Sequence, residues 1–177
     1  MTALEAYDLV TSGGGSDFAK VIALCEAIGS YCLIGGLAVN CYVEPVYTMD
    51  ADLVVVSSEI GRLSEPLRDA GFKTSEQEHS MNAQAAGSEL RIQFTTDSRY
   101  QDFLSRASVQ TVLGVPVRVA SLEDVTRGKL WAYSDPSRRL SKRKKDELDL
   151  IRLAEAWPHL KATYPPELAA ILDSQAP

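Results

Sequence analysis

The stretch Tyr31–Val56, YCLIGGLAVNCYVEPVYTMDADLVVV, is the part of the sequence that best predicts the fold. It opens with a short apolar run that stops at the glycine pair Gly35-Gly36, and a segment long enough for a short helix follows until Pro45. Proline cannot continue a helix, and it disfavours helical geometry in the residue before it. The stretch ends in the continuous run Leu53–Val56, which is typical of a buried strand. The pattern therefore predicts a strand, a turn, a short helix and a second strand.

Two carboxylates stand immediately before the end of this stretch. Asp50 and Asp52 are two residues apart, so on a strand their side chains point to the same face. Like charges side by side repel each other and weaken a strand unless a cation lies between them. Mg²⁺ suits this spacing, and Mn²⁺ can replace it, because such hard ions take oxygen ligands from carboxylates and phosphates. Asp50 and Asp52 are therefore candidate metal ligands; the alternative is an edge strand with solvated acids.

The glycine pair offers a place for a phosphate group. Gly35 and Gly36 lack a Cβ atom, so the backbone can approach a phosphate closely. The N-terminus of the helix that follows adds free N–H groups. A phosphate cradle followed by a metal-binding strand is an arrangement for phosphoryl transfer. Taken alone, the pair is equally consistent with a tight strand-to-helix turn.

Together these motifs resemble the nucleotidyltransferase superfamily, whose members have the DNA polymerase beta-like fold. The pattern is most similar to the AbiEii-type subgroup, which reads roughly GGxAV followed by TxDxDL; the matching segments here are Gly35–Val39 and Thr48–Leu53. A weaker similarity continues through Lys129 to the segment RKKDELDL. The resemblance implies an α/β (α+β) fold, with a mixed sheet flanked by helices and further helices at the C-terminal end.

The resemblance also implies a reaction and its partners. Asp50 and Asp52 would hold Mg²⁺, while the nucleotide-binding residues would be Gly35, Gly36, Thr48 and Lys129. An acceptor hydroxyl would attack the α-phosphate of an NTP and release pyrophosphate. The acceptor would be RNA or a protein side chain, and the protein would be the toxin of a toxin–antitoxin pair, with an antitoxin as partner. From the residues alone, Thr48 could equally be a β-former at a strand start, and Lys129 a solvated lysine.

A third carboxylate is expected from the resemblance, because nucleotidyltransferases place another acid on a neighbouring strand. The matching strand is Leu90–Thr95, and its position facing away from the apolar side is Gln93, which is a poor base. Asp97 is the preferred substitute and Glu89 a weaker one, which makes Asp97 a candidate catalytic residue with Asp50 and Asp52. The alternative function is a catalytically degenerate module that binds nucleotide or a partner and lacks the third acid.

Two further features lie near the helix expected from Lys144 to Ala156. Lys145-Asp146 and Asp149 match the subgroup's KDxxD segment, although acids near a helix start are also favourable electrostatically. The segment Arg138–Lys145 holds six of the 18 basic residues in a chain of net charge −6. We interpret it as a solvated face or as a contact for the acceptor, separate from the nucleotide site.

Length and composition set the limits of this interpretation. The 177 residues predict a core at residues 1–120 and a helical part at residues 121–177 packed on it. No run is long and apolar enough for a membrane span, and no signal peptide is expected at the N-terminus. Cys25, Cys32 and Cys41 are few and lie in apolar segments, so we expect reduced core thiols in a cytoplasmic protein.

The remaining segments give a coarser pattern. We expect helices at residues 16–28, 59–70 and from Ser121 onward, and strands at 90–95, 109–113 and 115–119. The polar segment 72–82 is ambiguous, and the small residues of 82–88 predict a loop.

Overall fold

One mixed sheet of seven strands organises the computed structural model, which describes residues 1–174. Its strand order is β3-β4-β5-β2-β1-β7-β6. The strands are β1 (Tyr31–Ile34), β2 (Asp50–Val55), β3 (Phe72–Gln77), β4 (Ser80–Ala85), β5 (Arg91–Thr95), β6 (Ser108–Val112) and β7 (Val115–Val119). The expected fold class, a mixed sheet flanked by helices, is confirmed.

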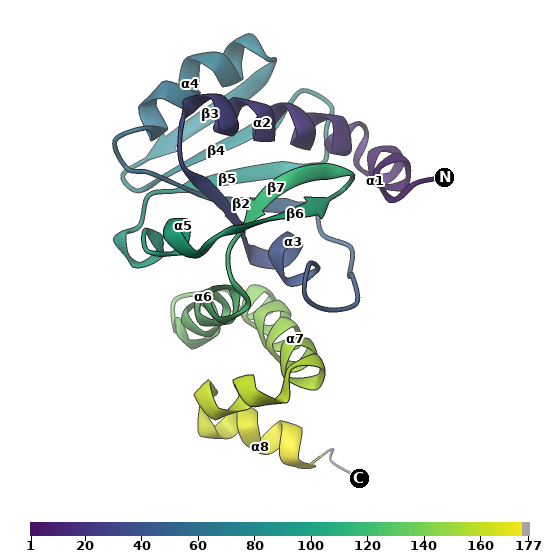
Figure 1. Cartoon of the computed structure of the whole chain (residues 1–177), viewed down its shortest axis with the longest axis vertical. Helices are drawn as coiled ribbons and strands as arrows, with labels where there is room; N and C mark the ends of the chain where they lie inside the picture. The colour runs from purple at the N-terminus through teal and green to yellow at the C-terminus, as the bar shows by residue number, and fades with distance from the viewer. Residues whose placement is uncertain (175–177) are drawn as a thin grey trace.

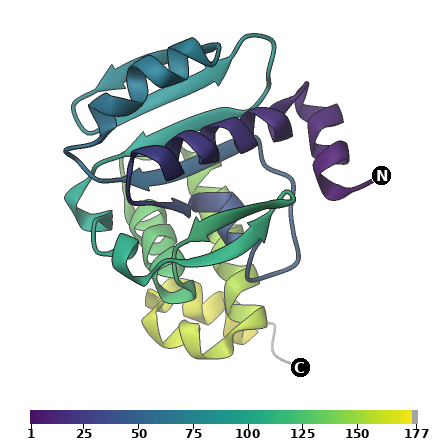
Figure 2. The ribbon, with the colours of Figure 1, turned by 45° about the horizontal axis from the view of Figure 1, so that its top comes forward.

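Helices cover the sheet and extend the chain beyond it (Figure 1). They are α1 (Ala3–Thr11), α2 (Gly14–Ile28), α3 (Gly35–Val39), α4 (Ile60–Asp69), α5 (Phe103–Arg106), α6 (Leu122–Ser134), α7 (Leu140–Ala156) and α8 (Pro166–Ser174), with short 3₁₀ turns at Ser98–Tyr100 and Pro158–Thr163. Helices α2 and α4 contact each other and lie across one face of the sheet (Figure 2). Helix α3 contacts α6 and α7, and α8 packs on α7 at the far end.

The central strand β2 fixes the two candidate metal ligands in the sheet. It pairs antiparallel with β1, where Ile34 is opposite Asp52. It pairs parallel with β5, where Asp50 is opposite Arg91 and Asp52 is opposite Gln93. Residues paired in this way point to the same side of the sheet. The acids, Arg91 and Gln93 therefore share one face.

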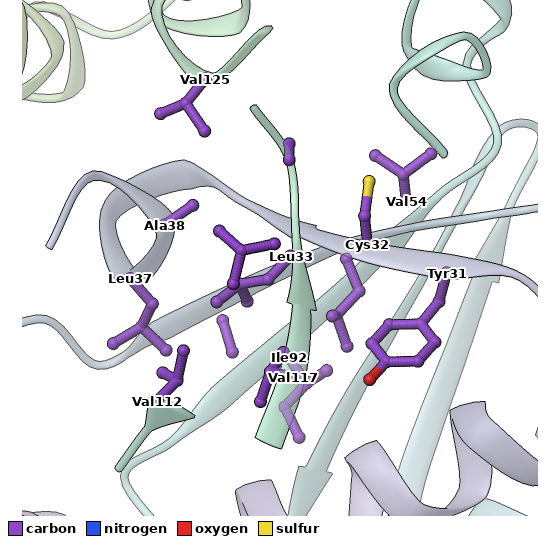
Figure 3. Close-up of a cluster of buried hydrophobic side chains, with 14 of the residues drawn as sticks. Tyr31, Cys32, Leu33, Leu37, Ala38, Val54, Ile92, Val112, Val117 and Val125 are labelled. Atoms are coloured by element: carbon purple, nitrogen blue, oxygen red, sulfur yellow. The ribbon is translucent and has the colours of Figure 1, made fainter. Parts of the chain in front are cut away.

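The alternation along β2 explains why the acids and the core separate. Ala51 and Leu53 are fully buried on the opposite face, where their β5 partners Ile92 and Phe94 are buried too. The core also includes β1 and α3, whose Leu33, Leu37 and Ala38 lie among the side chains of Figure 3. Each Å² of apolar surface that is buried contributes about 25 cal/mol to stability, so this layer is the main stabilising contribution to the fold.

Most predicted elements are present, and two segments differ. The ambiguous segment 72–82 and the first residues of the expected loop 82–88 form the hairpin β3–β4, because Met81 and Ala83 alternate toward the core as a strand requires. Residues 86–88 lie beyond β4, outside any strand, as expected. Helix α7 begins at Leu140, four residues before the expected start. The strand–turn–strand at 108–119 is confirmed; Leu113 and Gly114 both have positive φ, as a type I′ hairpin turn needs.

The proposed division near residue 120 falls where the last strand gives way to helices. Strand β7 ends at Val119 and α6 begins at Leu122, with the Ser121 hydroxyl accepting a hydrogen bond from the Asp124 N–H. The last three residues of the expected helical part, 175–177, lie outside the described residues. Among the helices of residues 1–174, none is both long and apolar enough to cross a membrane.

Candidate active site

A cleft of about 700 Å³ opens on the face of the sheet that carries Asp50 and Asp52. Its walls come from the turn after β1, the strands β2 to β5, and the helices α6 and α7. The charged side chains that line it are Asp50, Asp52, Lys73, Arg91, Lys129, Arg138, Lys142, Lys145 and Asp146. Six basic groups thus face three carboxylates, although the chain as a whole is acidic. Such a cleft attracts anions.

Asp50 is held by two cations from distant parts of the chain. Arg91 Nε lies 2.8 Å from Oδ1, and Lys142 Nζ donates a hydrogen bond of 3.0 Å to Oδ2. Partial burial raises the pKa of Asp50, but Lys142, Arg91 and Lys145 outweigh it and leave the pKa below its ordinary value. The carboxylate is therefore charged at neutral pH and lies where cations gather.

Asp52 lies deeper than Asp50, against the glycine turn. Burial raises its pKa above the ordinary value, and the positive charge of Lys129 opposes this rise most strongly but does not outweigh it. A Cβ atom built on Gly35 would stand 2.1 Å from Asp52 Oδ2. Asp52 is thus a poorly compensated charge in a confined position, a setting in which a bound cation would be stabilising.

The two glycines of the pair serve different purposes. Gly35 has a φ of +71°, which other residues rarely adopt, and its missing side chain makes room for Asp52. Gly36 lines the cleft, and a Cβ there would lie no nearer than 3.5 Å to Thr48. Gly35 is therefore required by the fold itself, whereas the space over Gly36 is open to a ligand. Because α3 has only five residues, the expected helix contribution to phosphate binding is small.

Thr48 is a buried support at the start of β2. Its hydroxyl accepts a hydrogen bond from Lys145 Nζ at 3.1 Å and one from the Asp50 N–H at 3.3 Å. Its carbonyl accepts a bond of 2.7 Å from the hydroxyl of Tyr7 on α1. Thr48 also lines the cleft, next to the position predicted for phosphate.

Lys129 is buried, not solvated, since only 8% of it is exposed. Its ammonium lies 3.0 Å from Asp146 Oδ1 and 2.7 Å from Asp149 Oδ2. Arg138 binds the other oxygen of Asp146 at 2.6 Å, and Arg152 binds the other oxygen of Asp149 at 2.8 Å. Lys129 does line the cleft, but its charge is already shared between the two acids of the KDxxD segment.

Gln93 lies on the face of β5 that the alternation predicted, at the position where the resemblance implies a third acid. Gln93 is directly opposite Asp52 and lines the cleft. Asp97 lies beyond the end of β5, where its carboxylate caps a 3₁₀ turn and binds Arg99 at 2.7 Å. Neither Asp97 nor Glu89 is among the residues that line the cleft. The catalytic role expected for Asp97 is not supported by this position and stays a prediction.

Three of the six basic residues in the segment 138–145 line this cleft. They are Arg138, which binds Asp146, Lys142, which binds Asp50, and Lys145, which binds the Thr48 hydroxyl. Arg143 and Lys144 point elsewhere, to the Tyr133 carbonyl and to Glu147. Sequence reasoning missed Arg91, Lys142 and Lys145 as site residues. For the two lysines the available signal was the basic run that ends in the first residue of the KDxxD segment, and for Arg91 the sequence offered none.

A second, smaller cleft of about 200 Å³ adjoins the first on the other side of Asp52. It shares Asp52, Gln93 and Lys129 with the larger cleft and adds Gly35, Tyr100 and Asp124. Asp124 is itself neutralised by Arg106, whose Nε and Nη2 donate to its two oxygens at 2.7 and 2.8 Å. Asp52 therefore stands where the two clefts meet.

The donor set fits a divalent ion held by two carboxylates and by oxygens from a substrate. Asp50 and Asp52 are on one face of the sheet. Asp50 is paired with two basic side chains, whereas the charge of Asp52 is not adequately compensated. Within residues 1–174, no group of three or more acidic, histidine or cysteine side chains is placed to bind a metal. The residues thus fit a Mg²⁺ that keeps waters and phosphate ligands, and not a closed protein cage.

The mixed sheet and its helices have the fold seen in solved nucleotidyltransferase structures. The chain is similar to the solved structure of the antibiotic-resistance factor ANT(2″)-Ia in complex with adenylyl-2″-tobramycin, with a TM-score of 0.59 and 16% identity over 90% of this chain and 97% of that one. It is also similar to the lincosamide antibiotic adenylyltransferase LnuA with lincomycin bound (TM-score 0.50, 13% identity, 72% and 87% covered). A third is an antigenic nucleotidyltransferase-like protein from Paracoccidioides brasiliensis (TM-score 0.50, 21% identity, 89% and 93% covered).

No protein-family model matches the sequence, and no curated protein matches it. At these identities the similarity establishes the fold alone.

Proposed function

We propose that the protein is a Mg²⁺-dependent nucleotidyltransferase, which moves an NMP from an NTP to a hydroxyl group of an acceptor. The observation that carries this proposal is the meeting of Asp50, Asp52 and a basic wall in one cleft beside the open backbone of Gly36. Triphosphate and divalent cation are the ligands that such a mixture of charges suits. Adenylyltransferases among the solved structures of this fold support the same chemistry.

Each group of residues has a place in the reaction. Asp50 and Asp52 would hold Mg²⁺, which supplies charge neutralisation at the phosphates when bound. Lys142 and Lys145 would balance the triphosphate, and the Gly36 backbone would let it approach closely. Lys129 would act indirectly, as the charge that ties Asp146 and Asp149 together next to Asp52.

A specific observation favours a second function, a module that binds nucleotide without transferring it. The position opposite Asp52 holds Gln93, which cannot accept the proton of an attacking hydroxyl. General-base assistance is typically worth ~10²–10⁴-fold in rate. Both functions share the nucleotide site, and they differ only in turnover.

Two classes of acceptor have support. The resemblance to AbiEii-type proteins suggests RNA or a protein side chain and a toxin role with an antitoxin partner. The solved structures that carry tobramycin and lincomycin suggest small antibiotics. The six basic groups of the cleft favour an acceptor that is not strongly cationic.

Thermal unfolding with Mg²⁺ and each NTP tests the nucleotide site. A ligand that binds only the native state raises the melting temperature, and Asp52→Asn should abolish the rise caused by Mg²⁺ and NTP. Gly36→Ala is the sharper variant, because its Cβ fits the free protein and would obstruct only a ligand. Lys144→Ala, outside the cleft, is the matched control. An equal rise in wild type and in Asp52→Asn would remove Asp52 from the site.

A further inference from the structure

The open face of β3, β4 and β5 continues the site sideways from Asp52. Cross-strand pairing places Ser75 opposite Asn82, Asn82 opposite Gln93, and Gln93 opposite Asp52. These four side chains therefore form one row across four strands, on one face of the sheet. With strands about 4.8 Å apart, the row is ~14 Å long. We call the part from Ser75 to Gln93, with Lys73 and Gln84, the β3–β5 platform.

The platform is polar and exposed, while its other side is core. Ser75, Asn82 and Gln93 are exposed and line the large cleft. Their neighbours Met81, Ala83 and Ile92 point the other way and are buried. An exposed row of amides and a hydroxyl beside a buried row is ordinary for a sheet edge. The unusual feature is that this row leads directly to Asp52 and forms the floor of a cleft.

The charge on the platform is positive and has no acid beside it. Lys73, opposite Gln84, lines the cleft and forms none of the ion pairs found in residues 1–174. The three carboxylates of the cleft, Asp50, Asp52 and Asp146, lie at β2 and α7, away from the hairpin. The one acid of β3, Glu76, turns to the opposite face, where Ser64 and Arg68 of α4 bind it.

Amides with a nearby lysine suit a particular chemistry. Asn and Gln side chains each present a donor and an acceptor, which match the edges of nucleobases. A lysine without a counter-charge suits a phosphate. Gln84 donates its amide N–H to the Ser88 carbonyl, so Asn82 and Gln93 are the amides with both groups available to a ligand.

We propose that the β3–β5 platform is the acceptor subsite and that the acceptor is a nucleotide unit, either free or at the end of a single-stranded RNA. This inference rests on the proposed function. The base would contact Asn82, a phosphate would contact Lys73, and a ribose hydroxyl would lie beside Asp52. In the transfer, the hydroxyl oxygen bonds to the α-phosphorus of the NTP, the bond from that phosphorus to the bridging oxygen breaks, pyrophosphate leaves with the electron pair, and the proton passes to water.

Binding without NTP tests the platform separately from the transfer reaction. The probes are 5′-AMP, a single-stranded oligoribonucleotide with a free 3′-hydroxyl, and tobramycin as a polycation. The oligoribonucleotide should bind, and Asn82→Ala should weaken it about fivefold to tenfold through the loss of one or two hydrogen bonds. Lys73→Ala should reduce the slope of log affinity against log salt by about 0.7, the value for one phosphate of a single strand. If 5′-AMP binds as tightly as the oligomer, the source is the free nucleotide.

Matched variants separate recognition from general surface effects. Gln77 is on the same strand as Ser75 but does not line the cleft, and Lys144 carries a distant charge. Gln77→Ala and Lys144→Ala should therefore bind the oligoribonucleotide as the wild type does. Asn82→Asp should weaken the oligoribonucleotide more than Asn82→Ala does, because it adds a negative charge. Unchanged oligonucleotide binding in Asn82→Ala and Lys73→Ala, or tighter binding of tobramycin than of the oligomer, would overturn the proposal. If the protein binds the oligoribonucleotide but not Mg²⁺–NTP, the proposed function is contradicted, while the assignment of the β3–β5 platform is not.

Discussion

Lys142 Nζ lies 3.0 Å from Asp50 Oδ2, although 92 residues separate the two in the sequence. A basic side chain of α7 thus binds one of the two carboxylates proposed to hold Mg²⁺. The same lysine lines the cleft in which the triphosphate is proposed to bind. A shift of Lys142 from carboxylate to phosphate on ligand binding would be electrostatically consistent, because the metal takes over the charge on Asp50.

This relationship predicts opposite effects of Lys142→Ala on metal and nucleotide. Mn²⁺ alone should bind more tightly than to wild type, by about twofold to fivefold, since a partly exposed ion pair no longer competes. Mg²⁺–ATP should bind more weakly, because a phosphate contact is lost. Electron paramagnetic resonance measures free Mn²⁺, and calorimetry measures the nucleotide. Effects of the same sign on both would show that Lys142 does not exchange between the two partners.

Lys129 is predicted to matter for stability more than for phosphate contact. Burial lowers its pKa, but Asp149 and Asp146 outweigh this and raise the pKa above its ordinary value of 10.5. Lys129→Met leaves these two buried acids without their common partner, which should cost about 3–5 kcal/mol. The melting temperature should fall by ~10 °C for a chain of this size.

The pH dependence provides the check on this charge. A raised pKa means that the contribution of Lys129 is complete below pH 10.5 and is lost as the pH rises through the pKa of the folded state. The difference in unfolding free energy between wild type and Lys129→Met, measured in urea, should therefore shrink at alkaline pH. An unchanged melting temperature together with weaker ATP binding would instead favour a direct contact of Lys129 with phosphate, as the resemblance implies.

The central part of the fold could be predicted because local pattern and tertiary position agree there. The acids of β2 alternate with buried apolar residues, so their shared face follows from strand geometry alone. The face on which Gln93 lies followed in the same way from the alternation of Ile92, Gln93 and Phe94, whereas its pairing with Asp52 is a finding of the structure. At these positions the register is fixed by burial of one face, and a one-residue slip would expose the core.

The rest of the site depends on contacts that no local pattern records. Lys142 and Lys145 reach β2 only because α7 starts at Leu140 and packs near α3, and nothing in the basic run shows its direction. The hairpin β3–β4 was missed because Ala83 and Ala85 have low β-propensity, although Ala83 is buried and Ala85 partly buried against the core. Both errors arose where tertiary packing outweighed intrinsic preference.

The three cysteines are predicted to be poorly reactive in the folded protein. Burial raises the pKa of Cys25 and of Cys32 to about 12 and that of Cys41 to about 11, from 9.0. Because the thiolate is the reactive form, at pH 8 a pKa near 11 reduces it about a hundredfold relative to an ordinary thiol. Ellman's reagent should label all three in denaturant and, without it, Cys41 slowly and the other two hardly at all. Rapid labelling of Cys25 or Cys32 in the native protein would contradict the buried positions.

Gln93 is predicted to limit the rate of transfer. It stands opposite Asp52 and lines the cleft, so Gln93→Asp places a carboxylate where a third metal ligand and proton acceptor would act. The rate of NMP transfer from a labelled NTP should rise by about 10²-fold or more if general-base assistance is restored. Asp97→Asn should leave the rate within about twofold, because the Asp97 carboxylate binds Arg99 and lies outside the cleft. Gln93→Asn, which keeps the amide, is the control for the change in side-chain length. Robust wild-type activity that Asp97→Asn abolishes, with no gain from Gln93→Asp, would identify Asp97 as the working third acid despite its position.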